Sequence, residues 1–295
     1  MNLKTVAALI ETMRPKQWIK NLLVYAGVIF SLKFFDLIPL IRSTAAFILF
    51  SLISGTVYIM NDLLDYERDL AHPRKKNRPI PSGRLPKSFA KVALVVIAAV
   101  SFGASFRLSV SFGFVALGYF LINIAYSIRL KHVVIIDVMI IALGFVLRAV
   151  AGSVVIHVEF SHWLLICTLL LALFLAICKR RAELNLIKDN AGNHRAVLDH
   201  YTPALVDQMT SVVTASALVA YALYTISPEV TDKLHTDKLI YTFPFVLFAI
   251  FRYLYLVMAR DEGGSPEKIF LQDKAMIIDM AGWILTVIAI LYFKL

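Results

Sequence analysis

Long runs of apolar residues alternate with short polar segments along almost the entire chain. A run of about 18 or more apolar residues is long enough to cross the hydrocarbon core of a bilayer as a helix. A shorter segment, residues 3–13, has apolar positions on one side only and predicts an amphipathic helix on the membrane surface. The pattern therefore predicts an all-α polytopic membrane protein with about nine transmembrane helices. The expected spans are residues 19–38, 43–64, 88–105, 109–128, 133–156, 162–178, 204–226, 239–258 and 276–293.

Composition supports a membrane protein and argues against a nucleic-acid-binding protein. The 295 residues are 59% hydrophobic and 17% charged, and the mean hydropathy is +0.75. A soluble domain of this length does not need so much apolar sequence. The net charge of +10 lies in the short loops between apolar runs, which is typical of membrane orientation and of binding to anionic ligands or lipids. Cys167 and Cys178 lie in one apolar run and are expected to be buried thiols.

The distribution of Lys and Arg predicts the orientation of the chain. With nine spans, most of the 30 Lys and Arg residues fall on the side of the N-terminus and of the loops after the even-numbered spans. Basic loops stay in the cytoplasm, so we expect a multi-pass protein of a bacterial-type cytoplasmic membrane with a cytoplasmic N-terminus. The two long charged loops, residues 65–87 and 179–203, then share the cytoplasmic side. They are expected to cap the functional site of the protein.

Three carboxylates and an amide stand where the second apolar run ends. On one continuous helix, Asn61, Asp65 and Asp69 fall at about 0°, 40° and 80° and Asp62 at about 100°, so they share one face. Mutual repulsion makes this arrangement costly unless positive charge lies among the carboxylates. Oxygen ligands of this kind suit Mg²⁺, which keeps several waters and shares a substrate's phosphates. The basic loop that follows, residues 70–84 including Arg78, favours a site for a metal-bound phosphate ester.

Other polar residues lie within or beside the apolar runs. Asp137 and Arg148 are eleven residues apart, so they fall within about 20° on one helix but about 16 Å apart along its axis. We expect both side chains to face the protein interior. We do not expect them to pair with each other, so each should have its own partner. Before the first span, residues 14–21 place hydrogen-bond donors where an anion could bind.

The acidic segment resembles the first motif of the UbiA superfamily of intramembrane prenyltransferases. The resemblance is carried by Asn61-Asp62-x-x-Asp65-x-x-x-Asp69 followed by Arg78-Pro79-Ile80-Pro81-Ser82-Gly83, and it covers nearly the whole chain. It implies a single domain, residues 1–295, with a ring of nine helices around a central cavity. It also implies a lateral opening to the bilayer that admits an isoprenoid substrate.

The second half of the chain differs from the commonest pattern of that superfamily. Aromatic prenyltransferases carry an Asp-x-x-x-Asp element after the sixth span, where this chain has Lys179-Arg180-Arg181-x-Glu183. That element, residues 14–21 and His194-Arg195-x-x-Leu198-x-x-Tyr201-Thr202 resemble the decaprenyl-phosphate phosphoribosyltransferase branch. The resemblance implies transfer of 5-phosphoribose from 5-phosphoribosyl 1-diphosphate to a polyprenyl phosphate for lipid-linked pentose in a cell-envelope glycan, with release of diphosphate. More positive charge and fewer carboxylates suit a site that holds several phosphates.

The resemblance also assigns candidate roles to individual residues. Asp62, Asp65 and Asp69 are the expected catalytic ligands of Mg²⁺. Lys179, Arg180 and Arg195 are candidates for binding the sugar phosphate or the lipid phosphate, and Glu183 for orienting them or binding ribose hydroxyls. The full set of candidate substrate-binding residues is Gln17, Lys20, Asn21, Asn61, Arg78, Lys131, Arg148, Lys179, Arg180, Glu183, Arg195 and Tyr201.

Two other functions are alternatives at this stage, and the expected partners are lipids and phosphorylated metabolites. An aromatic prenyltransferase of the same superfamily would use the same first motif. A carrier of a phosphorylated solute would use midplane basic residues such as Arg148 and show broken helices in inverted repeats. The expected partners are a polyprenyl phosphate, 5-phosphoribosyl 1-diphosphate, membrane lipids and a second copy of the chain in a homo-oligomer, but not nucleic acid.

The loop charges lead to a test of topology. A reporter fused after Leu295 is expected to be external, whereas one inserted in the segment 179–203 is expected to be cytoplasmic. The reason is that an odd number of expected spans, the seventh to the ninth, separates the two insertion points. Accessibility of the reporters to a membrane-impermeant label measures this. Both reporters on the same side would contradict the odd number of spans.

Overall fold

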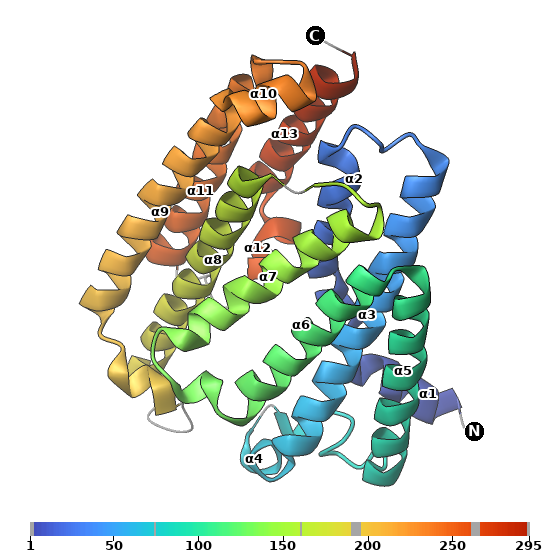
Figure 1. The fold of residues 1–295 in the computed structure, drawn as a ribbon. Helices are drawn as coiled ribbons and strands as arrows, with labels where there is room; N and C mark the ends of the chain where they lie inside the picture. Colours follow the sequence, from blue (N-terminus) through green and yellow to red (C-terminus); the bar gives the residue numbers. More distant parts are fainter. Residues whose placement is uncertain (1–2, 74, 160, 190–195, 261–265, 294–295) are drawn as a thin grey trace. The chain divides into compact units, whose positions relative to one another are not determined.

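The computed structural model describes residues 3–73, 75–159, 161–189, 196–260 and 266–293. Every regular element in these ranges is a helix (Figure 1). The α-helices are α1 (Leu3–Thr12), α2 (Ala26–Phe30), α3 (Leu37–Leu64), α4 (Tyr66–Ala71), α5 (Lys87–Leu108), α6 (Val110–Ile128), α7 (Ile136–Val155), α8 (His162–Asp189), α9 (Pro203–Ile226), α10 (Pro228–Leu234), α11 (Phe243–Ala259), α12 (Pro266–Gln272) and α13 (Lys274–Phe293). The 3₁₀ helices are η1 (Pro15–Tyr25), η2 (Lys75–Asn77), η3 (Leu130–His132), η4 (Ala196–His200) and η5 (Lys238–Thr242).

Among the described residues, eight helical segments are long and apolar enough to cross a membrane. They are α3, α5, α6, α7, α8, α9, η5 with α11, and α13, and they coincide with the second to the ninth expected span. Their apolar side chains are partly exposed, as at Val92, Val95 and Val96 of α5. Exposed apolar faces of this kind are stable in contact with lipid and not with water. The prediction of an all-α polytopic membrane protein is confirmed.

The structure differs from the sequence-based prediction at three boundaries. The first expected span, residues 19–38, contains most of η1, the short α2 and a turn, and is not one continuous α-helix. The second span begins earlier than expected, at Leu37 of α3, and ends at Leu64 as predicted, because Asp65 has non-helical backbone angles and separates α3 from α4. The sixth span continues to Asp189 in α8, so residues 179–189 are helical and do not belong to a loop.

The helices cluster into two compact units, which we describe separately. The first unit comprises Met1–Ile29, Lys33–Arg129 and Leu147–Glu159. Here α3 packs against η1, α5 and α6, and α5 and α6 lie beside it in Figure 1. Phe50, Ile53 and Phe112 are fully buried at the centre of this packing.

The second unit comprises Phe30–Leu32, Leu130–Val146 and Phe160–Leu295. Its main pairings are α8 with α9 and α11 with α13. One core forms around Phe174, Tyr253 and Met276, and a second around Tyr224 and Leu239.

Two glycines allow a very close backbone contact in the first unit. A Cβ atom added to Gly152 of α7 would lie 1.8 Å from the carbonyl oxygen of Val24 in η1. A Cβ atom on Gly27 would lie 2.8 Å from the carbonyl carbon of Gly152. Small residues of this kind let helices in membranes approach closely enough for their backbones to touch. The contact fixes η1 against the second half of α7.

We predict that Gly152→Ala destabilises the protein by about 1–3 kcal/mol or more, because the new methyl group forces the two backbones apart. Thermal unfolding in detergent measures the loss. Gly118→Ala is the matched control: Gly118 also lies in a spanning helix of this unit, but its added Cβ atom meets nothing within 4 Å. Equal unfolding temperatures for the two variants would contradict the close contact.

Candidate functional site

The acidic motif lies at the end of α3, where two of its three carboxylates are almost completely buried. Asp62 is in the last turn of α3 and is 1% exposed, and Asp69 in α4 is 2% exposed. The Nη1 atom of Arg78 donates to Asp62 Oδ1 at 3.1 Å and to Asp69 Oδ2 at 2.6 Å. Buried carboxylates are stable as anions only when they are paired in this way. Arg78 therefore bridges the two ends of the motif.

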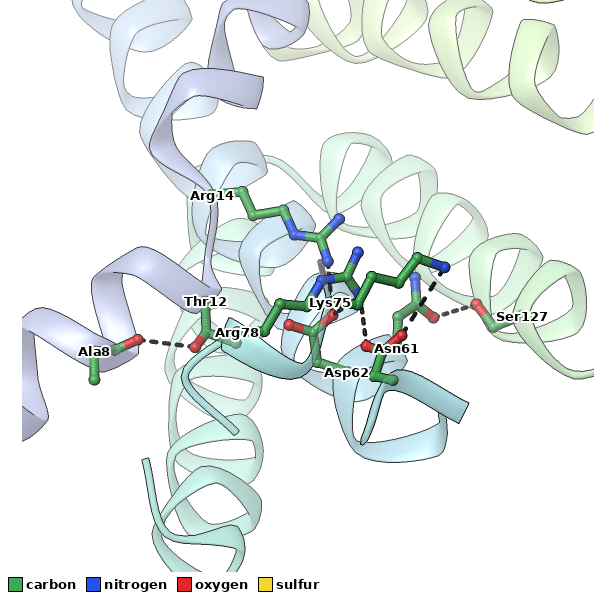
Figure 2. Close-up of polar contacts among 9 residues, drawn as sticks. Ala8, Thr12, Arg14, Asn61, Asp62, Lys75, Arg78 and Ser127 are labelled. Atoms are coloured by element: carbon green, nitrogen blue, oxygen red, sulfur yellow. Dashed lines mark hydrogen bonds and ion pairs between the residues drawn. The ribbon is translucent and has the colours of Figure 1, made fainter. Parts of the chain in front are cut away.

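A second arginine reaches the same carboxylate from the N-terminal segment. The Nη2 atom of Arg14 donates to Asp62 Oδ1 at 2.6 Å, and its guanidinium group lies over the ring of Tyr58. Lys75 adds a weaker ion pair, with Nζ 4.0 Å from Asp69 Oδ1. Figure 2 shows Arg14 reaching the motif from the N-terminal segment, and Lys75 and Arg78 reaching it from the loop that follows α4. Positive charge therefore lies among these carboxylates, which offsets their mutual repulsion.

Arg14 is a site residue that the sequence alone did not identify. Its backbone is in the left-handed region, with φ 53° and ψ 65°, which is uncommon for a residue other than glycine. This conformation turns the chain between α1 and η1. Arg14 and Asp62 are 48 positions apart, so no local spacing could connect them. The only signal was the presence of Arg14 in the basic segment that leads into the first span.

The remaining two residues of the motif have different surroundings. The side-chain oxygen of Asn61 accepts a hydrogen bond from the Ser127 hydroxyl, which also contacts the Asn123 carbonyl oxygen at 2.7 Å. This contact orients the Asn61 amide. Asp65 is half-buried at the break between α3 and α4. The break means that the motif follows two helices and not the single helical face that the spacing predicted.

The loop that carries Arg78 is fastened to the amphipathic helix α1. The two terminal nitrogens of Arg84 donate to the two carboxylate oxygens of Glu11 at 2.7 and 2.9 Å, and one of them also reaches the Asn77 carbonyl oxygen. The hydrogen bond from Arg84 lowers the pKa of the Glu11 carboxyl group. Buried Ile80 and Leu85 anchor the same loop. These contacts hold Arg78 in place beside the acidic motif.

The donor set of this motif fits a magnesium ion that is shared with a phosphate. In the described part of the chain, no three His, Cys, Asp or Glu side chains are grouped so that they alone could hold a metal. Mg²⁺ is, however, usually bound through one or two carboxylates together with waters and substrate phosphates. Asp62, Asp65, Asp69 and the Asn61 amide supply oxygen ligands of the required kind. The residues therefore fit Mg²⁺ as part of a metal–phosphate complex.

A second polar cluster in the first unit surrounds Arg148. Its Nε donates to Asn21 Oδ1 at 2.7 Å and its Nη2 to the Tyr119 hydroxyl at 2.9 Å. Asn21 in turn donates to the hydroxyls of Ser51 and Ser54. Arg148 and Asn21 are 7% and 1% exposed, so both lie in the interior of this unit. The cluster fastens η1 to α3, α6 and α7.

In the second unit, Arg180 and Asp137 form a buried ion pair. Arg180 Nε donates to Asp137 Oδ2 at 2.8 Å, and Arg180 Nη1 donates to Glu183. Arg180 is 1% exposed and Asp137 is fully buried. Asp137 and Arg148 thus have separate partners, as the sequence predicted.

Tyr201 completes this network through the other oxygen of Asp137. Its hydroxyl donates to Asp137 Oδ1 at 2.8 Å and accepts a hydrogen bond from the backbone nitrogen of Ile135 at 2.8 Å. Burial, and then the hydrogen bond to Asp137, raise the pKa of Tyr201 to about 12. Tyr201 therefore remains a neutral hydroxyl donor at physiological pH.

The remaining candidate residues either have intermediate exposure or lie outside the described residues. Gln17 and Lys20 in η1 are half-buried, as are Lys131 in η3 and Lys179 in α8. Arg195 lies outside the described residues. The structure thus brings together Asn61, Asp62, Asp69 and Arg78 in one unit and Arg180, Glu183 and Tyr201 in the other.

Comparison with known proteins places these features in a family of related chains. The chain is 33% identical over 301 residues to the decaprenyl-phosphate phosphoribosyltransferase of Mycolicibacterium smegmatis, with 98% of this chain and 94% of that protein covered. It is 32% identical over 290 residues to the protein of the same name from Corynebacterium glutamicum, with 96% and 86% covered.

A solved structure and a family model agree with these relatives. A UbiA homolog from Archaeoglobus fulgidus, solved with GPP and Mg²⁺, has the same fold, with a TM-score of 0.71 at 19% identity over 96% of this chain and 99% of that chain. Residues 22–277 match the model of the UbiA prenyltransferase family. The extent of this match, together with near full-length relatives at more than 30% identity, shows that the chain belongs to the UbiA prenyltransferase family.

Proposed function

We propose that this protein transfers 5-phosphoribose from 5-phosphoribosyl 1-diphosphate to a polyprenyl phosphate and releases diphosphate. The observation that carries the proposal is the similarity, over nearly the whole chain, to relatives named decaprenyl-phosphate phosphoribosyltransferase. The Lys179-Arg180-x-x-Glu183 element on α8 is consistent with it, because aromatic prenyltransferases have a pair of aspartates at that point. The product would be a lipid-linked phosphoribose for cell-envelope glycan synthesis.

In this proposal the first unit binds the diphosphate of the donor. Asp62, Asp65, Asp69 and Asn61 would hold Mg²⁺, which supplies charge stabilisation to the leaving diphosphate when bound. Arg14 and Arg78 already lie against Asp62, so their positive charge is available next to the same phosphate oxygens. Pre-placed positive groups stabilise charge that develops in a transition state without further reorganisation. The support for this role comes from burial and charge in this unit.

The chemical step needs little acid–base assistance from the chain. The bond between the anomeric carbon and the diphosphate oxygen breaks, and its electron pair leaves with the diphosphate. An oxygen of the lipid phosphate forms the new bond to the anomeric carbon, which passes through an oxocarbenium-like state. Because the lipid phosphate is already an anion, a strong general base is unnecessary.

In the second unit, Arg180 would act through the residues that it holds. Its guanidinium group lies between Asp137 and Glu183 and is almost fully buried. Removal of one partner from a buried ion pair leaves an uncompensated charge. We therefore propose that Arg180 positions Glu183 and the end of α8, and that Lys179 is the better candidate for direct contact with a phosphate.

We also propose the orientation that the loop charges favour. The N-terminus and the segments 65–87 and 179–203 would lie on the cytoplasmic side, where Mg²⁺ and soluble phosphorylated metabolites are available. The membrane would be a bacterial-type cytoplasmic membrane. Loop charge supports this arrangement.

The substrate class can be tested with the purified protein. With Mg²⁺, 5-phosphoribosyl 1-diphosphate and decaprenyl phosphate, we expect one lipid-linked phosphoribose for each diphosphate released, measured by mass spectrometry and a phosphate assay. Polyprenyl diphosphate with an aromatic acid should give no product. Prenylation of the aromatic acid without any ribosyl product would contradict this proposal and would show that the protein is an aromatic prenyltransferase. Absence of turnover, together with solute uptake into vesicles, would favour a carrier.

The role of the acidic motif can be tested at its most accessible carboxylate. Asp65→Asn should lower turnover about 100-fold or more, because loss of a metal ligand removes stabilisation of the leaving group. Its unfolding temperature should stay close to that of the wild type. Steady-state kinetics over a range of Mg²⁺ concentrations measures the effect. Glu67→Gln is the matched control, since this exposed carboxylate lies two positions further on in α4. Near-normal turnover of Asp65→Asn would exclude the metal role.

A further inference from the structure

The backbone of Ile135, in the turn before α7, has a conformation that is costly for this residue type. Its φ angle is 69°, in the left-handed region. Among the non-glycine residues with positive φ in the described part of the chain, only Ile135 has a β-branched side chain. A positive φ angle is a genuine outlier for such a residue. Conformations of this kind cost free energy and cluster at functional sites, so the turn needs an explanation.

The explanation lies in the backbone groups of Ile135 and not in its side chain. The side chain is 47% exposed, so its burial does not offset the strain. The carbonyl oxygen accepts hydrogen bonds from the backbone nitrogens of Val138 and Met139 at 3.2 and 3.0 Å, at the start of α7. The backbone nitrogen donates to the Tyr201 hydroxyl at 2.8 Å. Ile135 is therefore held on one side by α7 and on the other by Tyr201.

Tyr201 is itself fixed in position by the helices on either side of it. Its side chain is 4% exposed and packs in a core of the second unit. Its backbone nitrogen donates to the carbonyl oxygen of Leu198 in η4 at 3.1 Å. The next residue, Thr202, caps α9, because its hydroxyl accepts a hydrogen bond from the backbone nitrogen of Leu205 at 3.2 Å. The Tyr201 hydroxyl therefore has a defined place from which it can hold the turn.

The hydrogen bonds of this hydroxyl argue against direct contact between Tyr201 and a phosphate. A hydroxyl group has one donor and two acceptor lone pairs. Its donor is used by Asp137 Oδ1, and one of its acceptor sites is used by the backbone nitrogen of Ile135. The oxygens of an ionised phosphate are acceptors, so Tyr201 could donate to them only by releasing a buried carboxylate. The geometry thus favours a positioning role over the substrate contact that the sequence suggested.

The turn that Tyr201 holds follows directly on η3, which contains the candidate residue Lys131. The backbone nitrogen of Val133 donates to the carbonyl oxygen of Leu130 at 3.2 Å, which joins η3 to the turn, and η3 also packs against η4. A change of φ at Ile135 to an ordinary negative value would rotate η3 relative to the start of α7. The place of Lys131 therefore depends on the conformation of Ile135.

We propose that Tyr201 is a positioning residue that holds Ile135 in its left-handed conformation and thereby places Lys131 to bind a phosphate of the substrate. Lysine is a compact point charge of the kind that binds phosphates. The proposal rests on the proposed function only for the identity of that phosphate. Since the strained turn is held by one hydroxyl, removal of a single oxygen atom releases it.

Tyr201→Phe removes only that oxygen atom and tests the proposal in the purified full-length protein. The KM for 5-phosphoribosyl 1-diphosphate should rise about 10-fold while kcat stays within about 2-fold, because a contact made equally in the ground state and the transition state is weakened. Hydrogen–deuterium exchange of residues 130–137, followed by mass spectrometry in detergent, should become faster. An unchanged KM or an unchanged exchange rate would overturn the proposal.

A rescue experiment separates the turn from the other contact of the hydroxyl. Glycine adopts positive φ angles without steric cost, so Ile135→Gly in the Tyr201→Phe background should bring KM back to within about 3-fold of the wild type. His235→Gly is the matched control, since His235 at the end of α10 also has a positive φ angle in the second unit. It should not rescue. Rescue by neither variant would assign the effect to Asp137 and overturn the proposal, as would equal rescue by both.

Two variants of Ile135 carry the test if Tyr201→Phe does not fold. Proline fixes φ at about −65° and removes the N–H group that meets the Tyr201 hydroxyl. The KM of Ile135→Pro should therefore exceed that of Ile135→Gly by about 10-fold. Equal KM values for these two variants would overturn the proposal.

The outcomes also separate this inference from the proposed function. If the wild type gives only an aromatic prenylation product, KM is measured for the prenyl diphosphate, and faster exchange with rescue by Ile135→Gly would keep the positioning role while the phosphoribosyl assignment fails. If the wild type makes lipid-linked phosphoribose while Tyr201→Phe leaves KM and exchange unchanged, the assignment stands and the positioning role fails.

Discussion

The first unit depends on the pairing of two buried carboxylates with arginines from outside their own helices. Asp62 and Asp69 are too buried to remain charged without partners, and Arg78 contacts both of them. The left-handed turn at Arg14 and the attachment of the 72–86 loop to α1 through Glu11 and Arg84 both serve to bring these arginines into place. The electrostatic constraint therefore explains why segments so far apart in sequence are held together at one end of α3.

The need to pair buried charges also applies to the second unit, and a count of basic residues in the sequence does not reveal it. Replacement of an acidic pair by Lys179 and Arg180 suggests a strongly positive surface. In the structure, however, Arg180 is compensated by Asp137 and Glu183, and Arg181 is paired with Asp207. The local charge is thus close to balanced, and much of the basic element maintains structure. Basic side chains can be buried in a membrane protein only when acidic side chains pair with them.

The sequence predicted most of the fold, because apolar runs of spanning length specify helices almost directly. The exceptions depend on tertiary contacts. The segment 19–38 is apolar nearly all round, so its periodicity could not distinguish a 3₁₀ helix from an α-helix. In the structure, Asn21 and Val24 of η1 contact α3 and α7, which no local pattern could predict. Likewise, nothing local at residues 179–189 separates a charged loop from a helix that extends beyond the apolar run.

The candidate site was predicted in composition but only partly in geometry. The residues of the acidic motif and Arg78 were identified from their spacing and charge, and the structure brings Asp62, Asp69 and Arg78 into direct contact. The break at Asp65 and the contact from Arg14 were not predictable, since a kink and a pairing over 48 positions leave no periodic signal.

The order of the ion-pair partners along the chain also affects how the protein is made. Synthesis proceeds from the N-terminus, so Arg14 emerges from the ribosome 48 residues before Asp62 and is already available to it. Asp69 must wait a further nine residues for Arg78. Lys75, the weaker partner of Asp69, is made three residues before Arg78. A truncation or fusion between Lys75 and Arg78 would therefore leave Asp69 with its weaker partner alone and would remove the arginine that bridges Asp69 and Asp62.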